Sequence, residues 1–289
     1  MSSDSNNPIP SYNSDAKRLS TLEKENRALR EQVERIDRER VEYLQNVSHQ
    51  LVAPLHAIKW HIENLSSGRV GVDRAKKVLR SIYSQSTIAV HLAKNFALMS
   101  NLDADHALSA LREPLEEVEL FRLLINLADD FQPLGWDKEI QISVKNGTSF
   151  ESAPPILAIK PLIGQVFSNI IENAVKYSQR RSEIIIDGEH HARSDVVSVT
   201  IRNRGIKLMA EDANRIFERG FRTAEAKNLY PAGTGFGLYI ARRIVELHEG
   251  AISAIPAEGG AIFEVVLPIR ALEGKARQRG SKDYSPHRR

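Results

Sequence analysis

The stretch GTGFGLYIARRIVELHEG, residues 233–250, joins a glycine-rich turn to an amphipathic helix predicted from Leu238 to His248. Glycines let backbone amides approach an anion at the start of a helix. The turn is not a dinucleotide-binding fingerprint, because Leu238 stands where the last glycine belongs and a turn-prone loop precedes it. It also lacks the lysine of a P-loop. The stretch therefore predicts an anion-binding helix start of another kind.

Short alternating segments and amphipathic segments surround this helix from about residue 114 onward. Strands and helices mixed in this way predict a sheet with helices on one face. Residues 250–267 have two adjacent glycines at their centre and predict a closing hairpin. The predicted strands are Ile140–Val144, Glu183–Asp187, Val196–Ile201, Ala251–Ile255 and Ala261–Leu267, and the predicted helices lie near Leu120–Phe131, Pro161–Tyr177 and Leu238–His248.

The predicted helix Pro161–Tyr177 carries a polar face. Asn169 and Asn173 lie four residues apart, and Lys176 follows three residues later. This spacing places two amides and an ammonium group on one side of the helix, where they suit phosphate and a hydrated metal ion. Taken alone, the pattern also fits a hydrogen-bonded surface helix.

An apolar seam runs through residues 19–36 at alternating spacings of three and four residues, with charged residues between them. The seam predicts a coiled coil, and the polar Asn26 within it favours a parallel dimer because it fixes the register at a cost in packing. The alternative is an amphipathic helix that packs within its own chain. The seam consists of Leu19, Leu22, Asn26, Leu29, Val33 and Ile36.

The apolar series continues to Leu65, after which Gly68 and Gly71 end the helix, and a second stripe runs from Ala75 to Phe96. Two such stripes joined by a short loop predict a helical hairpin. One hairpin covers its own stripe poorly, whereas two hairpins from two chains close into a four-helix bundle. The hairpin therefore agrees with the predicted dimer.

His49 lies on the first helix about 160° from the core stripe, so we expect its imidazole to face solvent. His56 and Trp60 return to nearly the same face, and Pro54 removes a helix hydrogen bond nearby. An exposed imidazole on a rigid helix is available for reaction. The alternative is a histidine that is merely solvated.

The composition excludes several classes of protein. Of the 289 residues, 42% are hydrophobic and 27% charged, which argues against a disordered chain, and the absence of cysteine excludes disulfide scaffolds and thiolate metal sites. No apolar run suits a membrane helix and residues 1–15 do not suit a signal peptide, so we expect a cytoplasmic protein that meets a membrane only through an upstream segment. The net charge of +3 comes from the basic residues 273–289, which lack an aromatic platform, so nucleic acid is not an expected partner.

Together, four ordered motifs resemble the transmitter region of a two-component sensor histidine kinase over residues 40–268. Four motifs in order are far more specific than any one of them. The phosphoacceptor box is resembled by SHQLVAPL at 48–55, and the asparagine box by NIIENAVKYS at 169–178. The first glycine box, running into the phenylalanine box, is resembled by IRNRGIKLMAEDANRIFERGFR at 201–222. The second glycine box is resembled by GTGFGLYIARRIVELHEG at 233–250.

The resemblance implies an α+β fold: a coiled coil, a dimerising helical hairpin that forms a four-helix bundle in the dimer, and a two-layer α/β sandwich of the histidine kinase and gyrase type that binds ATP. It implies a homodimeric protein histidine kinase that phosphorylates His49 and passes the phosphoryl group to an aspartate of a response-regulator receiver domain. The implied domains are a disordered N-terminus (1–16), a coiled coil (17–45), a dimerisation and phosphotransfer domain (46–105), an ATP-binding domain (114–270) and a basic disordered tail (271–289).

The resemblance also assigns roles to single residues. Asn173 coordinates a Mg²⁺ ion that bridges the phosphates of ATP, with Asn169 nearby, and Mg²⁺ usually takes few protein ligands. Lys176 and Tyr177 contact phosphate or ribose, and residues 223–232 form a mobile lid. The other implied nucleotide contacts are Asn203, Gly205, Gly233, Thr234, Gly235, Phe236, Gly237 and Leu238.

Five positions depart from the family's pattern, among them Val52, which replaces a usual basic residue. Gln50 replaces the acid that usually follows the phosphoacceptor, and Ala53 replaces a Thr or Asn that positions water. Asn203 replaces the Asp that accepts from adenine, and Lys207 replaces a glycine. Gln50, Ala53, Asn203 and Lys207 motivate an alternative function, a degenerate histidine kinase that serves as a nucleotide-binding or scaffolding dimer without autokinase activity, whereas the retained His49, Asn173 and glycines favour the active kinase.

Overall fold

The computed structural model describes residues 12–67, 71–102, 114–145, 149–231 and 233–269. Its internal contacts divide the chain into two units, Met1–Ser48 and His49–Arg289, and helix α1 (Tyr12–Ser66) runs through the division. None of the described helices is both long and apolar enough to cross a membrane.

In the first unit, helix α1 leaves its apolar seam uncovered. Leu19, Leu22, Leu29 and Val33 are between 55% and 62% exposed. The side chain of Ile36 lies outside the described residues. The coiled coil itself stays a prediction, because it requires a second chain.

The second unit begins with the rest of α1, which passes through Pro54 without a break, and α2 (Val72–Leu102) follows. A hydrogen bond of 2.8 Å between Ser81 Oγ and His61 Nε2 joins the two helices. The predicted helical hairpin is therefore present. Its predicted stopping glycine Gly68 lies outside the described residues. The hairpin leaves large apolar side chains exposed, among them Leu55 (54%), Ile62 (49%) and Leu79 (57%).

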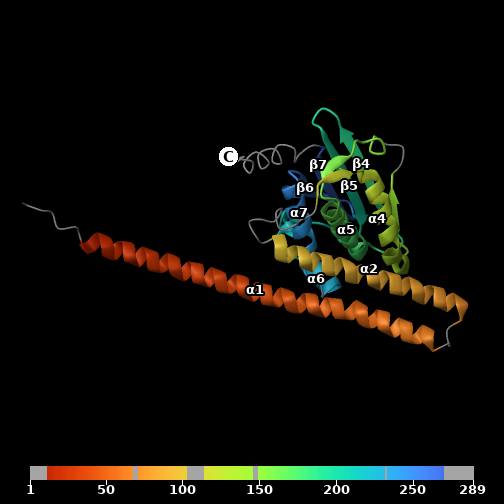
Figure 1. Cartoon of the computed structure of the whole chain (residues 1–289), viewed down its shortest axis with the longest axis horizontal. Coiled ribbons are helices and arrows are strands. Elements are labelled where there is room, and N and C mark those ends of the chain that lie inside the picture. Colours follow the sequence, from red (N-terminus) through yellow and green to blue (C-terminus); the bar gives the residue numbers. More distant parts are fainter. Residues whose placement is uncertain (1–11, 68–70, 103–113, 146–148, 232, 270–289) are drawn as a thin grey trace, which may run out of the picture. The chain divides into compact units, whose positions relative to one another are not determined.

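The rest of this unit, residues 114–269, is a two-layer sandwich. Helices α4 (Leu120–Gly135), α5 (Lys160–Tyr177) and α7 (Gly237–Leu247) pack on one face of a five-stranded sheet (Figure 1). The strand order is β2-β4-β5-β7-β6, with β2 parallel to β4 and the other pairs antiparallel. The strands are β2 (Gln141–Val144), β4 (Glu183–His191), β5 (Val196–Arg204), β6 (Ala251–Ala257) and β7 (Gly260–Pro268).

Alternation along the strands places the core between the sheet and the helices. In β7, Ala261, Phe263, Val265 and Leu267 are buried at every second position. Opposite them, α5 buries most of its length, which explains why its sequence is apolar on more than one side. All five predicted strands and all three predicted helices are present, and the predicted fold class is confirmed for the hairpin and the sandwich.

The prediction missed several short elements. These are a two-stranded antiparallel sheet of β1 (Glu116–Val118) and β3 (Ile156–Ala158), helix α6 (Ala224–Leu229) and three single-turn 3₁₀ helices. A three-residue strand holds too few residues to show an alternating pattern, so its position depends on tertiary pairing. The 3₁₀ helices are η1 (Trp136–Lys138), η2 (Ala210–Asp212) and η3 (Arg215–Phe217).

His248, directly after α7, ties that helix to the start of α5. It is 2% exposed, its Nδ1 lies 2.8 Å from the carbonyl oxygen of Ile244, and its Nε2 accepts from the amide of Ile159 at 3.2 Å. Nε2 can accept only when the ring is neutral. Burial lowers the pKa of His248 and outweighs the hydrogen bond to Ile244, which raises it.

We predict that the sandwich loses stability as the pH falls below about 6.5, the ordinary pKa of histidine. In that range His248 binds a proton in the unfolded chain but stays neutral in the folded chain. The unfolding free energy therefore falls by up to about 1.4 kcal/mol for each pH unit of acidification. Urea unfolding at pH 7.5 and 5.5 measures this slope. The variant His248→Asn keeps a donor and an acceptor without a titratable ring and serves as the control. An equal slope in both proteins contradicts the assignment.

Candidate functional site

A cavity lies between α5, the end of β5, the segment 221–235 and the start of α7. It gathers most of the residues predicted to bind a nucleotide, although they are spread over more than 60 positions of the sequence. The predicted residues in its lining are Gln50, Asn169, Asn173, Lys176, Tyr177, Asn203, Gly233, Thr234, Gly235, Gly237 and Leu238. His49, Gly205 and Phe236 are not part of that lining.

Two amides of α5 stand at the cavity. Asn169 is 1% exposed, and its Nδ2 is a buried donor without a partner among the described residues. A Cβ atom added at Gly237 would lie 3.2 Å from Asn169 Oδ1, so the glycine lets α7 begin directly against this amide. The side chain of Asn173, one turn further, is half-buried and has no hydrogen-bond partner in the described part of the chain. Both side chains can therefore serve a ligand.

Lys176 is the cation of the cavity that the sequence predicted. Its Nζ lies 5.7 Å from the ring centre of Tyr177 and 5.3 Å from that of Tyr230. Burial lowers the pKa of Lys176, and the cations Arg222 and Lys138 lower it further, whereas Glu172 opposes them. Burial also raises the pKa of Tyr177, so its hydroxyl stays protonated. The site thus combines one partly desolvated ammonium group with a neutral phenol.

Lys138 supports this end of α5 from outside the cavity. Its ammonium group donates to the carbonyl oxygens of Val175 at 3.1 Å, Lys176 at 2.6 Å and Ser178 at 3.4 Å. Carbonyl groups at a helix C-terminus lack intrahelical partners, and a cation there also suits the helix dipole. Lys138 therefore stabilises the turn of α5 that carries Lys176.

Arg222 holds the segment predicted as a lid. Its guanidinium donates to the carbonyl oxygens of Pro231 (3.1 Å), Gly233 (2.7 Å), Ala226 (2.7 Å) and Tyr230. The segment contains α6, whose first turn is capped by Thr223 Oγ1 accepting from the amide of Ala226. The sequence analysis placed Arg222 at the end of a motif but gave it no role. Only the folded segment shows that four carbonyl groups converge on it.

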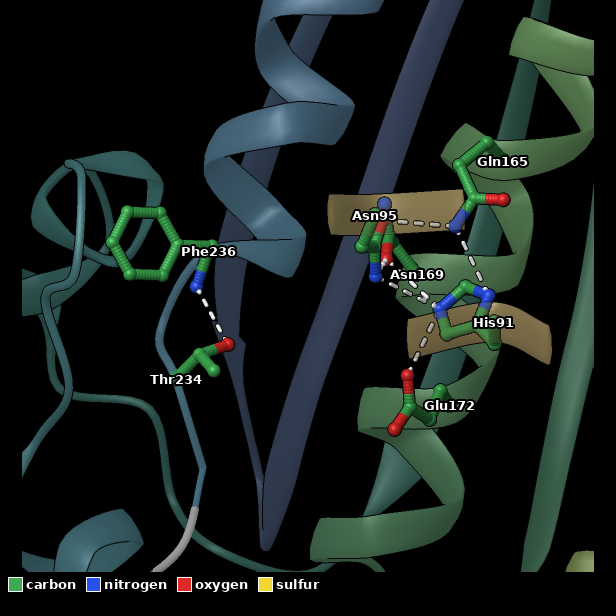
Figure 2. Close-up of polar contacts among 7 residues, drawn as sticks. All are labelled: His91, Asn95, Gln165, Asn169, Glu172, Thr234 and Phe236. Atoms are coloured by element: carbon green, nitrogen blue, oxygen red, sulfur yellow. Dashed lines mark hydrogen bonds and ion pairs between the residues drawn. The ribbon is translucent and has the colours of Figure 1, made fainter. Parts of the chain in front are cut away.

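The glycine-rich turn leads into α7 at the cavity. Gly235 has φ +74°, a left-handed conformation that favours glycine, and an added Cβ would lie 2.8 Å from the backbone of Gly220. The amide of Phe236 donates to Thr234 Oγ1 at 3.4 Å (Figure 2). The first amides of α7 thus lie beside the cavity, where a helix N-terminus favours an anion.

Two residues that were predicted to contact the nucleotide pack against other parts of the protein. Phe236 is buried, with the guanidinium of Arg219 5.8 Å from its ring centre, so its side chain supports the turn instead of lining the cavity. Gly205 lies where β5 meets the end of α5, and an added Cβ would stand 1.9 Å from the carbonyl oxygen of Tyr177. Gly205 is therefore required for close packing between backbones. The predicted direct contact of these two residues with a nucleotide is not supported by the structure.

Asn203 lies in the cavity at 4% exposure, and its Nδ2 donates to Ser178 Oγ at 3.4 Å. This hydrogen bond engages the amide nitrogen and leaves the oxygen as the group that can accept from a ligand. Lys207 also lines the cavity, where its ammonium group can reach a ligand.

The hairpin borders the same cavity. Gln50 lies in its lining, together with Leu92 and Asn95 of α2. His49, the residue before Gln50, is exposed, as the helical periodicity predicted.

The comparisons identify the sandwich. Residues 159–271 match the protein family described as histidine kinase-, DNA gyrase B-, and HSP90-like ATPases. These residues form an ATPase-type domain. The chain is also similar to a sensor protein kinase, WalK, of Staphylococcus saprophyticus, with 28% identity over 243 residues, 83% of this chain and 38% of the relative. The histidine protein kinase SaeS of Staphylococcus epidermidis is 27% identical over 218 residues, 74% of this chain and 59% of the relative.

The chain is related to the sensor histidine kinases, which confirms the resemblance found in its motifs. It spans less than two thirds of the length of these curated relatives. Among solved structures, full-length ShkA in complex with AMPPNP is similar in fold, with a TM-score of 0.52, 22% identity, and coverage of 78% of this chain and 45% of that one. The ATPase-type domain confirms the expectation of an ATP-binding fold.

Proposed function

We propose that the chain is an ATP-dependent protein histidine kinase that phosphorylates its own His49. The observation that carries this proposal is the cavity. It combines the unpaired Nδ2 of Asn169, the amide of Asn173, Lys176 and the helix start at Gly237 with a border formed by Gln50, the neighbour of His49. Phosphoryl transfer depends mainly on positioning and on neutralising charge, and this set of groups supplies both.

The residues take the following parts in nucleotide binding. The start of α7 and Lys176 contact the phosphates, and the unpaired Nδ2 of Asn169 donates to the ligand. The oxygen of Asn203 accepts from the base. Arg222 holds the lid, residues 223–232, over the ligand.

Mg²⁺ fits the donors of this site. Among the described residues, no group of three or more His, Cys, Asp or Glu side chains is placed to hold a metal ion. The amide oxygen of Asn173 is free to act as a single protein ligand, and Mg²⁺ is commonly held by one or two protein oxygens together with phosphates and waters. Bound in this way, Mg²⁺ supplies charge neutralisation at the phosphates.

In the transfer step, a nitrogen of the His49 imidazole forms a bond to the γ-phosphorus while the bond to the bridging oxygen breaks and ADP leaves. The imidazole proton passes to solvent, because the amide of Gln50 is not a base. His49 is exposed, so water reaches it readily.

We also propose a homodimer and a response-regulator receiver domain as partner. The uncovered seam of α1 and the exposed Leu55, Ile62 and Leu79 of the hairpin are apolar surfaces that a second copy of the chain would cover. The exposed phosphohistidine would then be accessible to the receiver domain, whose aspartate accepts the phosphoryl group.

Incubation with γ-labelled ATP and Mg²⁺ tests the proposal. We expect a protein-bound label that is stable to base, is lost in acid, and moves to an added receiver domain from a panel of such domains. ATP binding by calorimetry without any label would instead support the degenerate alternative and reject the kinase.

Lys176 gives this site a pH dependence. Its lowered pKa means that it loses its charge below the usual value of about 10.4, and the negative phosphates of ATP favour the charged form. We therefore predict that the affinity for ATP falls as the pH rises toward that value, and that binding takes up a proton. Calorimetry between pH 7 and 9.5 measures both effects. The variant Lys176→Arg keeps its charge in this range, so a similar loss of affinity in that variant contradicts the assignment.

A further inference from the structure

Helix α2 contacts α5 through a buried polar cluster. We call it the α2–α5 cluster. Figure 2 shows the five side chains meeting between the two helices, next to the glycine-rich turn. The cluster consists of His91 and Asn95 on α2 and of Gln165, Asn169 and Glu172 on α5.

His91 lies at the centre of the cluster and is 5% exposed. Its Nε2 lies 2.9 Å from Asn169 Oδ1 and 2.9 Å from Glu172 Oε2, and its Nδ1 lies 3.0 Å from Gln165 Nε2. Two acceptors face Nε2 at 2.9 Å, one donor faces Nδ1, and Asn95 Nδ2 lies further away, 3.4 Å from Nε2. Both acceptors require a proton on Nε2.

Asn95, one turn along α2, completes the network. Its Oδ1 accepts from Gln165 Nε2 at 2.9 Å, and its Nδ2 donates to Asn169 Oδ1 at 2.8 Å. The oxygen of Asn169 is therefore approached by donors from two residues of α2. This arrangement determines which way the amide of Asn169 is turned, and it assigns the unpaired Nδ2 to the ligand.

The charge on Glu172 makes it energetically unfavourable to separate α5 from α2. Burial raises the pKa of its carboxyl group, but His91 and Lys176 outweigh burial and lower the pKa below its ordinary value. The carboxylate is therefore charged. The side chain of Glu172 is 23% exposed, and a partly buried charge that loses its hydrogen-bonded partner is unfavourable, so His91 holds α5 against α2.

The cluster lies level with the phosphoacceptor along the hairpin. The hydrogen bond between His61 and Ser81 shows which residues of the antiparallel helices α1 and α2 lie opposite one another. Continued eleven residues along each helix, the same register places Gln50 opposite Leu92. Gln50 and Leu92 both line the nucleotide cavity, as do Asn95, Asn169 and Glu172 of the cluster. The cluster thus forms part of the cavity wall that faces the turn of α1 bearing His49.

We propose that the α2–α5 cluster positions the ATPase-type domain on the hairpin so that its cavity opens toward the turn of α1 that carries His49. His91 and Asn95 are then positioning residues for phosphoryl transfer, although neither reacts. This inference rests on the proposed kinase function. It assigns a purpose to a buried histidine that the sequence motifs left unexplained.

The test uses four variants of the full chain. His91→Ala and Asn95→Ala remove contacts from the α2 side; His91 is not part of the cavity lining, whereas Asn95 is. His91→Gln keeps a donor near Asn169 and Glu172 and serves as the conservative replacement. Lys94→Ala changes an exposed residue of the same turn and serves as the matched control.

Two readouts separate positioning from a general loss of structure. Hydrogen exchange of residues 165–172 reports whether α5 stays docked on α2, and urea unfolding reports whether the sandwich stays folded. The rate of His49 labelling at saturating ATP is then compared with the dissociation constant for ATP. We expect His91→Ala to increase exchange and to lower the rate about tenfold or more, because small misplacements of reacting groups are costly, with the dissociation constant within about threefold. Asn95→Ala should also increase exchange and lower the rate. His91→Gln should recover part of the rate, and Lys94→Ala should match the wild type.

Three results would overturn the proposal. Unchanged exchange in His91→Ala means that the cluster does not hold the two helices together. Faster exchange with an unchanged or higher labelling rate means that the cluster restrains the domain instead of positioning it. If the wild-type chain binds ATP but takes no label, the proposed kinase function is wrong, and so is the positioning role that rests on it. The exchange data still show separately whether the cluster holds α5 against α2.

Discussion

Replacing His49 with alanine is expected to remove all acid-labile label from the chain after incubation with γ-labelled ATP. The two imidazole nitrogens are the only atoms of this side chain that can accept the phosphoryl group, and alanine has no substitute for them. The helix should tolerate the change, because His49 is exposed and alanine has the best intrinsic helix propensity. ATP binding should therefore stay within about twofold of the wild-type value, since the substitution removes no group that binds the nucleotide.

His56 provides the matched control for this prediction. It is also an exposed histidine of α1, one heptad after His49 and on nearly the same face of the helix. The variant His56→Ala should keep its label. Mass spectrometry of the phosphorylated chain at neutral pH then locates the modification. Label that survives in His49→Ala and disappears in His56→Ala would move the phosphoacceptor to the second position.

Replacing Gly205 with alanine is expected to prevent the sandwich from folding stably. The added Cβ would lie 1.9 Å from the carbonyl oxygen of Tyr177 and 2.7 Å from the Cα of Ser178. Both are backbone atoms, so no side-chain rotation relieves the overlap, and the end of β5 must separate from α5. We expect a loss of about 4 kcal/mol or more, a large share of the stability of an ordinary domain. Circular dichroism and urea unfolding measure it.

Gly164 is the control for Gly205. It lies inside α5, and an added Cβ has only Leu123 Cδ1 nearby, at 4.0 Å. Because alanine favours a helix over glycine, Gly164→Ala should stabilise the chain by about 1 kcal/mol. If both variants unfold at the wild-type urea concentration, the close packing described at Gly205 is wrong.

The sequence predicted the long elements of the fold because their periodicity extends over many residues. The five strands of the main sheet and the helices α4, α5 and α7 were located with errors of a few residues at their ends. The three-residue strands β1 and β3 were missed because they depend on pairing with each other. The predicted domain boundaries, by contrast, stay predictions, since α1 passes through more than one of them without interruption.

The site was predicted as far as its residues belong to motifs. Asn169, Asn173 and Lys176 share a helix face, so their meeting in one cavity follows from helical geometry. The role of Gly205 could not be read in the same way, because a glycine required for packing looks like a glycine required for binding. His91 lies in no motif, and its partners are more than 70 residues away in the sequence. Only the three-dimensional structure joins them.

In the proposed kinase, Arg222 has a consequence for the release of ADP. One planar guanidinium holds four carbonyl groups of the segment over the cavity. Because these hydrogen bonds share one donor group, withdrawal of that side chain breaks all four simultaneously. The departure of ADP should then follow one exponential, with a rate set by the motion of one arginine.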